Sequence, residues 1–336
     1  VNSDLTVGDL TVTGAFEATG TIKLDGNYPT GTCNVALGDN ALGSGSLSGD
    51  FNTAVGTNAL LANTSADANT AIGRSSLCSN TTGNCNTGLG MNALLGNTEG
   101  FGNVAVGRSS MVANTTGDNN VAVGQNSLVS NTTADNNTAV GTCSLTANTT
   151  GNANTAVGIT SLQANTTGAN NVAVGRCALY SNTTASDNTA VGVSSMILTT
   201  TGCQNTAVGQ QSLKNNTTGD NNTALGFYAL CTNSTADNNT AVGFCSLKTN
   251  STGANNTAVG RFALVFNQTG ATNTAVGQNS LHSNTTASDN TAVGAGSLYA
   301  NTTGASNVAI GRQALTASTT GAVNTAVGYG ALTTNT

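Results

Sequence analysis

The chain has 336 residues and a mass of only 32.9 kDa, because 42 positions are Gly, 49 are Asn and 59 are Thr. Charged residues make up 7% and aromatic residues 4%, with one His and no Trp, so the side chains of acid–base, nucleophilic and metal sites are scarce and we expect no enzymatic activity, no cofactor and no metal. A net charge of −6 excludes an electrostatic attraction to nucleic acid, and no run of 18 apolar residues is present to span a membrane.

Residues 1–33 have a rhythm of their own. Between residues 4 and 25, apolar and polar residues alternate in groups of five or six that end in Gly, with Leu5, Val7 and Leu10 among the apolar set. These groups predict short β segments that cap the following region or join it to a neighbour. Residues 27–33 predict a linker turn around Pro29.

Residues 34–336 repeat with a fixed period. A Gly preceded by Ala-Val or a close variant occurs eighteen times, from Gly38 to Gly328, and the spacing is the same at every step after a first step that is one position longer. With that Gly as column 0, the unit reads N-[TV]-A-V-G-x-x-[SA]-L-x-x-N-T-T-[GA]-x-x from column −4 to column +12. Loops of globular proteins tolerate insertions, so the invariant period indicates that each unit stacks on its equivalent in the next.

The unit is too short for a pair of helices. Two stretches, N-T-A-V-G and x-x-S-L-x, have the length of β-strands and are bounded by turn residues. We expect one coil per unit with two short strands, stacked in parallel and in register at about 4.8 Å per coil into a rod of about 80 Å. The predicted fold is all-β, a parallel β-roll or β-solenoid of eighteen 17-residue coils.

The pattern within the strand predicts an assembly. Successive strand residues point to opposite faces, so Ala in column −2 and the aliphatic residue in column −1 cannot both line one core. The small residues in columns −2 and +3 form smooth stripes that permit another backbone to approach closely. A homotrimer, with one stripe facing the coil's own core and the other the trimer axis, accounts for both stripes; a single-chain solenoid is the alternative.

The repeat resembles a known family. Residues 137–145 (NTAVGTCSL) and 188–196 (NTAVGVSSM) are similar to the SVAIGxxSxA head repeat of YadA-like trimeric autotransporter adhesins and related phage tail fibres, and residues 4–25 look like the LTVTG segments of phage fibre shafts. The resemblance covers residues 34–336 and implies a left-handed, trimeric β-roll that serves as an adhesin or a fibre shaft. The repeat departs from the family in carrying an added N-T-T-[GA] loop. Autotransporter anchoring features are not recognisable, which favours a virion or other extracellular fibre.

Two Asn columns are candidate sites. Column −4 is Asn in all eighteen copies, and stacked amides there predict a structural ladder, as at Asn52, Asn69, Asn86, Asn103, Asn120, Asn137, Asn154 and Asn171. Column +7 forms an Asn-x-Ser/Thr glycosylation acceptor in thirteen copies, the alternative being a second polar ladder. These copies are Asn63, Asn80, Asn114, Asn131, Asn148, Asn165, Asn182, Asn216, Asn233, Asn250, Asn267, Asn284 and Asn301.

Three further groups are candidate sites. The five Arg residues share column +1 and predict either a face that contacts a glycan or receptor, or a solvated face: Arg74, Arg108, Arg176, Arg261 and Arg312. Cys78 and Cys85 bracket one loop and predict a disulfide. Column +11 carries Asp in five copies, but only one per coil, so calcium is not expected. His282 is interpreted as a surface residue.

The sequence therefore predicts a structural protein and not an enzyme. We expect a rigid extracellular fibre or adhesin on a cell or virion surface, which associates with itself as a homotrimer or end to end and contacts a cell-surface glycan or receptor. Two alternatives stay open: a glycosylated subunit of a filament, and a solenoid that binds sugar or ice through flat Thr/Asn arrays. The second requires the N-T-T segments to form an exposed flat row and not a crowded corner.

Overall fold

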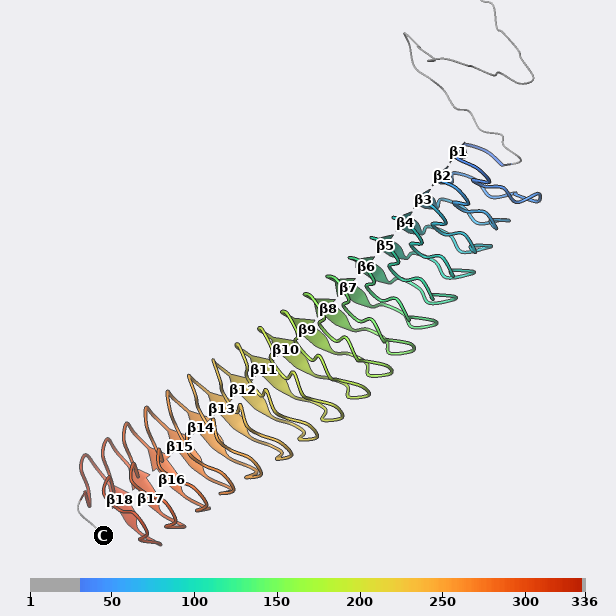
Figure 1. Ribbon diagram of the computed structural model, residues 1–336. Coiled ribbons are helices and arrows are strands. Elements are labelled where there is room, and N and C mark those ends of the chain that lie inside the picture. The colour runs from blue at the N-terminus through green and yellow to red at the C-terminus, as the bar shows by residue number, and fades with distance from the viewer. Residues whose placement is uncertain (1–30, 334–336) are drawn as a thin grey trace, which may run out of the picture.

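The computed structural model describes residues 31–333, which form a β-solenoid of eighteen stacked coils without a helix (Figure 1). The predicted all-β parallel solenoid is thus confirmed, whereas the β segments expected within residues 1–30 lie outside the described residues. Each coil contributes one strand of three residues, in columns −3 to −1. The strands are β1 (Val35–Leu37), β2 (Thr53–Val55), β3 (Thr70–Ile72), β4 (Thr87–Leu89), β5 (Val104–Val106), β6 (Val121–Val123), β7 (Thr138–Val140), β8 (Thr155–Val157), β9 (Val172–Val174), β10 (Thr189–Val191), β11 (Thr206–Val208), β12 (Thr223–Leu225), β13 (Thr240–Val242), β14 (Thr257–Val259), β15 (Thr274–Val276), β16 (Thr291–Val293), β17 (Val308–Ile310) and β18 (Thr325–Val327).

The strands form a single parallel sheet in chain order. Each column pairs with the same column of the next coil, so that Ala139 of β7 lies opposite Ala156 of β8. Backbone hydrogen bonds between coils continue outside the strands, as from Leu145 N to Ser161 O at 3.0 Å and from Thr149 N to Thr166 O at 2.9 Å. These bonds hold the columns in register, including between β1 and β2, whose coil is one residue longer than the others, and they favour the fixed period of the remaining coils.

The second predicted strand in each coil is not formed. The stretch x-x-S-L-x is a turn in which the residues of columns +2 and +4 have positive φ, for example 59° at Asn58 and 50° at Leu60. The N–H of Ala59 donates to the carbonyl of Gly56 at 3.2 Å within this turn. The coil must reverse direction in a few residues, and left-handed residues at alternate positions make that corner, whereas a strand would extend past it.

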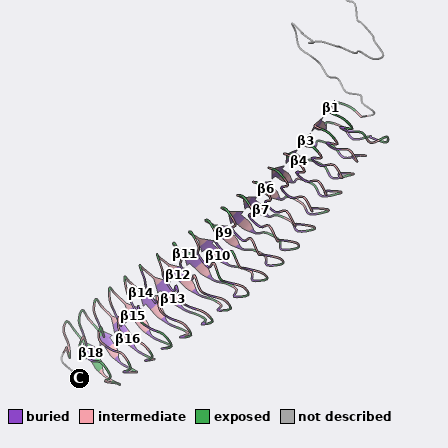
Figure 2. Ribbon diagram, in the orientation of Figure 1, coloured by how far each residue is buried: buried purple, intermediate pink, exposed green. Residues whose placement is uncertain are grey.

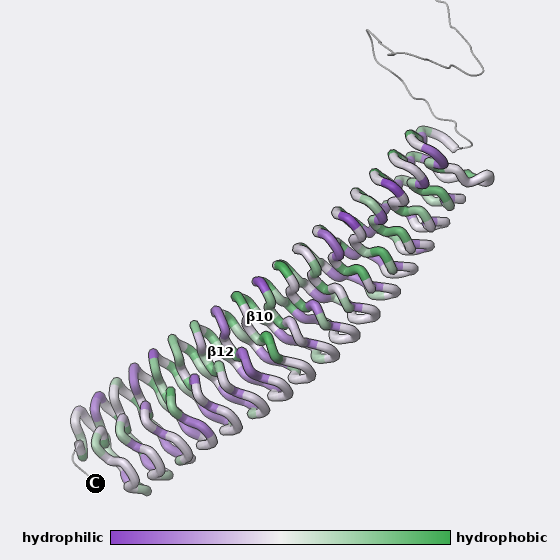
Figure 3. The backbone as a smooth tube through the Cα atoms, in the orientation of Figure 1, coloured by the Kyte–Doolittle hydropathy of each residue, from purple (hydrophilic) through white to green (hydrophobic). Residues whose placement is uncertain are grey.

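The core is a narrow column along the rod. The Ala side chains of column −2, the Ser or Ala side chains of column +3 and the Leu or Met side chains of column +4 point inward and are almost completely buried. Buried segments recur at the same place in successive coils (Figure 2), and apolar stretches align from coil to coil (Figure 3). Because the core repeats, every coil presents the same columns to solvent, and these columns define the candidate sites.

Candidate functional site

The outer face of the sheet is uncharged and carries a continuous row of aliphatic side chains. It is made by columns −3, which are Thr or Val, and −1, which are Val, Ile or Leu. The column −1 side chains point away from the core and include some of the more exposed aliphatic residues, such as Leu89 at 44%. We expected one of the two stripes of small residues to face a partner chain. That part of the prediction is wrong, because columns −2 and +3 both line the coil's own interior.

Column −4 forms a buried amide ladder along the rod. The backbone N–H of Asn154 donates to Oδ1 of Asn137 at 2.9 Å, and the Nδ2 of Asn154 donates to the carbonyl of Gly168 at 2.8 Å. The same pattern recurs from coil to coil, with some direct bonds between amides, such as Asn171 Nδ2 to Asn154 Oδ1 at 3.1 Å. The side chains therefore satisfy backbone groups that the short strands leave unpaired.

Column +7 forms a second amide ladder beside the first. Asn165 Nδ2 donates both to Oδ1 of Asn148 at 2.8 Å and to the carbonyl of Gly168 at 2.9 Å. The carbonyl of Gly168 thus accepts one bond from each ladder, since Asn154 donates to it as well. Column +10 is Gly or Ala in the coils that carry this motif, and these small residues are buried between the two ladders.

This burial contradicts glycosylation in column +7. The thirteen acceptor asparagines are all 0% exposed, and a glycan replaces a hydrogen on an Nδ2 that is already bonded inside the coil, which leaves no space for a sugar. The glycosylation prediction is therefore wrong for Asn63, Asn80, Asn114, Asn131, Asn148, Asn165, Asn182, Asn216, Asn233, Asn250, Asn267, Asn284 and Asn301.

The Thr residues that follow column +7 lie in a corner loop. In column +8 the Thr hydroxyl donates to the carbonyl of its equivalent in the next coil, as from Thr149 Oγ1 to Thr166 O at 3.1 Å. Within the N-T-T segment only column +9 is exposed. The segment is therefore a bend of the coil that exposes one residue per coil, mostly Thr, in column +9, and the alternative of sugar or ice binding stays a prediction.

The predicted disulfide between Cys78 and Cys85 is not formed. Both residues are free thiols, and Cys85 is exposed. The loop between them is closed instead by the buried amide of Asn80, whose Nδ2 donates to the carbonyl of Gly83 at 2.9 Å. The loop geometry is thus fixed by the same ladder in coils that have no cysteine.

The arginines of column +1 are exposed but dispersed. Arg74, Arg108, Arg176, Arg261 and Arg312 are separated by two to five coils along one edge of the rod. Arg261 lies over the ring of Phe262, with Cζ 4.7 Å from the ring centroid. The structure therefore does not bring the five guanidinium groups together, and a ligand at this column stays a prediction.

The aspartates of column +11 have a structural role that the sequence did not indicate. Asp135 Oδ1 accepts the backbone N–H of Asp118 at 2.8 Å, and Asn152 Oδ1 accepts that of Asp135 in the same way. Each side chain thus pairs with the exposed backbone of the preceding coil. Among residues 31–333, no group of three or more His, Cys, Asp or Glu side chains is arranged to hold a metal ion.

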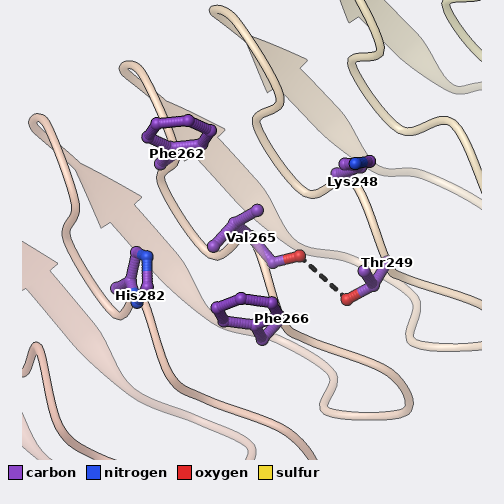
Figure 4. Close-up of a pocket in the computed structure, with 6 residues that line it drawn as sticks. All are labelled: Lys248, Thr249, Phe262, Val265, Phe266 and His282. Atoms are coloured by element: carbon purple, nitrogen blue, oxygen red, sulfur yellow. Dashed lines mark hydrogen bonds between the residues drawn. The ribbon is translucent and has the colours of Figure 1, made fainter.

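The coil also has a groove on the side opposite the sheet, which the sequence analysis did not predict. It has a volume of about 250 Å³ and is formed by columns +2, +5 and +6 of the coils that carry β13, β14 and β15. Its lining residues are Lys248, Thr249, Phe262, Val265, Phe266 and His282. Figure 4 shows Val265 at the centre with the aromatic rings and Lys248 around it. The groove could have been predicted from the bulky residues that occupy these three columns in adjacent coils.

His282 is part of this groove and not an isolated surface residue. Its ring stacks on Tyr299 with 4.7 Å between the centroids and meets the ring of Phe266 edge-on at 5.1 Å. Burial lowers the pKa of His282, so the imidazole is neutral at pH 7. Burial also raises the pKa of the nearby Cys231 thiol. The positive charges of Lys214 and Lys248 lower that pKa, but by less than burial raises it.

The fold defines the chain as a parallel β-solenoid of tandem repeats. No protein-family model matches the sequence, and the search of curated proteins gives no match. No helix in the described part of the chain is long and apolar enough to cross a membrane. The outer sheet face and the groove are therefore the two candidate interaction surfaces.

Proposed function

We propose that the chain is a subunit of an extracellular fibre in which three copies pack their sheet faces around a common axis. The observation that carries the proposal is the outer sheet face, which is uncharged and carries a row of aliphatic residues in column −1 along all eighteen coils, beside a row of Thr and Val in column −3. A row of partly exposed aliphatic residues that continues along the whole rod is characteristic of an interaction site. A second copy of the same rod is the partner that matches its length and its repeat.

Symmetry favours association of identical rods. Each sheet face repeats one coil at a time with unchanged register, so identical chains aligned in parallel present matching surfaces over their whole length. The Thr and Val side chains of column −3 are short and let the faces approach closely. Burial of the column −1 aliphatic residues supplies the free energy of association, at about 25 cal/mol per Å² of apolar surface.

The resemblance to trimeric adhesin heads and phage tail fibres supports the same proposal. Residues 137–145 carry the repeat pattern of those proteins, and the solenoid has the stacked coils that the resemblance implies. The proposed setting is the surface of a virion or a cell, where the rod holds or contributes a contact to a receptor. The alternative of a glycosylated filament subunit is not retained for column +7, because those amides are buried.

The proposal is tested by oligomeric state. We expect light scattering on the purified chain to give three times its 32.9 kDa mass. Replacing Leu89 and Val123, both in column −1, by Lys places charges in the proposed interface, so L89K/V123K should shift the mass toward that of the single chain. Far-UV circular dichroism of the variant checks that the solenoid itself is retained.

A matched control comes from the other side of the coil. Leu198 lies in column +6 and is 43% exposed, almost the same as Leu89 at 44%. L198K should leave the trimer intact, because this side chain does not lie on the sheet face. A wild-type chain that is monomeric at all concentrations, or equal dissociation of L198K and L89K/V123K, would contradict the proposal.

A further inference from the structure

One stretch of the rod departs from the polar surface of the other coils. Six of the ten Phe and Tyr residues in the described part lie within residues 227–299, on the coils of β12 to β16: Phe227, Tyr228, Phe244, Phe262, Phe266 and Tyr299. The core columns of these coils are unchanged. Variation confined to outward columns does not serve the core, and in repeat proteins such surface variation is where binding sites are built.

One side of the groove within this stretch is formed by aromatic side chains. Phe266 stands in column +6, which otherwise carries small or polar residues except at Leu198, and it is 48% exposed. His282 contacts the ring edge-on, and Tyr299 supports His282 by stacking. The aromatic row is therefore held in place by its neighbours while the Phe266 ring stays accessible, an arrangement that suits stacking of a ligand.

The same groove carries positive charge without a counter-ion. Lys214 and Lys248 are the lysines of the described residues, and both lie in column +5, two coils apart. The Nζ of Lys248 is 5.4 Å from the centroid of the Tyr228 ring. No Lys or Arg in residues 31–333 forms an ion pair with Asp or Glu. A chain of net charge −6 thus places one cation without an acidic partner, Lys248, in the lining of its aromatic groove, whereas Lys214 lies outside the groove. The charge of Lys248 complements an anion.

The size and polarity of the groove restrict the kind of ligand that it can bind. A volume of about 250 Å³ is below the range of drug-sized sites and fits one small ring. Of the polar residues in column +6, Thr249 lines the groove, and Ser283 lies in the coil after Phe266. The Thr249 hydroxyl donates to the carbonyl of Val265 at 2.8 Å, so its oxygen can accept a hydrogen bond from a ligand hydroxyl. The ligand therefore combines one apolar ring face, several hydroxyl groups and a negative charge.

We propose that this groove binds an acidic sugar residue of a cell-surface glycan, with the C–H face of its pyranose ring against Phe266 and its carboxylate toward Lys248. The neutral imidazole of His282 offers one hydrogen-bond donor or acceptor to a ring hydroxyl. This inference rests on the proposed function for its setting, since a fibre meets glycans on a surface. The groove itself is complete within one chain and does not use the sheet face.

The test compares two sugars that differ in the carboxylate. Saturation-transfer NMR and calorimetric titration are run on the full chain with D-glucuronate and with D-glucose at millimolar concentrations. We expect glucuronate to bind about tenfold more tightly than glucose, which corresponds to about 1.4 kcal/mol. Equal binding of the two sugars, or no binding of either, would overturn the proposal.

Two variants separate the contributions of stacking and charge. F266A should weaken binding of glucuronate about tenfold, and K248Q should bring glucuronate close to glucose while leaving glucose binding unchanged. Phe101 gives the matched control, because it is also 48% exposed but lies outside the groove, and F101A should bind as wild type. Loss in F101A equal to that in F266A, or no loss in F266A, would contradict the assignment.

The oligomeric state is measured on the same samples. Because the groove needs only one chain, a monomeric wild type that binds glucuronate overturns the trimer and keeps the sugar site. A trimeric wild type that binds neither sugar overturns the sugar site and keeps the trimer. Light scattering of F266A and K248Q, with circular dichroism, shows that any loss of binding does not come from loss of the rod.

Discussion

At the scale of single residues, the coil depends on conformations that most side chains avoid. The Leu or Met of column +4 has positive φ in every coil, for instance 50° at Leu145, and such a conformation costs a bulky residue about 1–2 kcal/mol. The Leu145 side chain is fully buried, which contributes about 1.5–3 kcal/mol. Burial therefore offsets the backbone strain, and the corner is maintained because an apolar side chain fills it.

The Gly of column 0 is required for a different reason. Gly141 has φ of 136°, and a Cβ placed on it would lie 2.5 Å from the carbonyl oxygen of Gly158 in the next coil. We expect G141A to lower the free energy of unfolding by about 2 kcal/mol or more, through strain at φ and the clash between coils. Chemical denaturation followed by circular dichroism measures the change.

Gly45 supplies the control for this prediction. No atom lies within 4 Å of the position that a Cβ would take there, so G45A should be neutral or stabilise by at most about 1 kcal/mol through the unfolded chain. Equal effects of G45A and G141A would show that the close approach between coils does not constrain column 0.

At the scale of the repeated element, stability depends on continuity of the two ladders. The column +7 ladder is interrupted where Thr199 and Ser318 replace Asn. At the first interruption both Asn182 Oδ1 and Thr199 Oγ1 are buried without a hydrogen-bond partner, and at the second the same is true of Asn301 Oδ1 and Ser318 Oγ. Each unpaired buried polar atom costs about 1–3 kcal/mol.

Restoring the ladder should stabilise the rod. In T199N the new Nδ2 occupies the place of its equivalents, where it can donate to Asn182 Oδ1 and the Gly202 carbonyl. We expect the free energy of unfolding to rise by about 1–3 kcal/mol, measured by thermal and denaturant unfolding. T201N makes the same change at an exposed position in column +9 and should have no effect. A T199N variant no more stable than T201N would refute the ladder's contribution.

The two ladders also show which features of the fold can be predicted from the sequence alone. The period, the parallel stacking and the identity of the core columns follow from the sequence, because every coil repeats the same constraint. The burial of column +7 does not follow, since an Asn-Thr-Thr segment such as 148–150 is equally compatible with an exposed acceptor. Its position is decided by the carbonyl of column +10, which two amides share, as at Gly168.

Other features depend on contacts that a single unit does not reveal. The stretch around Leu145 has the composition of a strand, but the coil must turn there, and its φ of 50° is set by closure of the coil. The groove around Phe266 arises from bulky residues in three adjacent coils, so that Lys248 and His282 each come from a different coil than Phe266. Only stacking brings these side chains together.

At the scale of the whole molecule, the rod is one-dimensional. Contacts between strands occur only between neighbouring coils, so its stability is approximately a sum of coil and nearest-neighbour terms. A whole coil is then a removable unit, whereas a fraction of a coil is not. Removing residues 137–153 joins Asn136 to Asn154 and leaves the remaining coils in register, because one whole period is lost.

We therefore expect the deletion of residues 137–153 to keep the solenoid, with a circular dichroism spectrum like that of wild type and a small decrease in unfolding midpoint. The control deletion removes residues 137–154, which leaves one coil a residue short, because Asn136 then directly precedes Thr155 and takes the column −4 position. The segment between Asn131 in column +7 and the new column −4 Asn is then one residue short, so the columns on either side of the junction no longer align with those of the neighbouring coils. This second variant should unfold at a clearly lower temperature or in two steps. Equal stability of the two variants would mean that the coils are not held in register by their ladders.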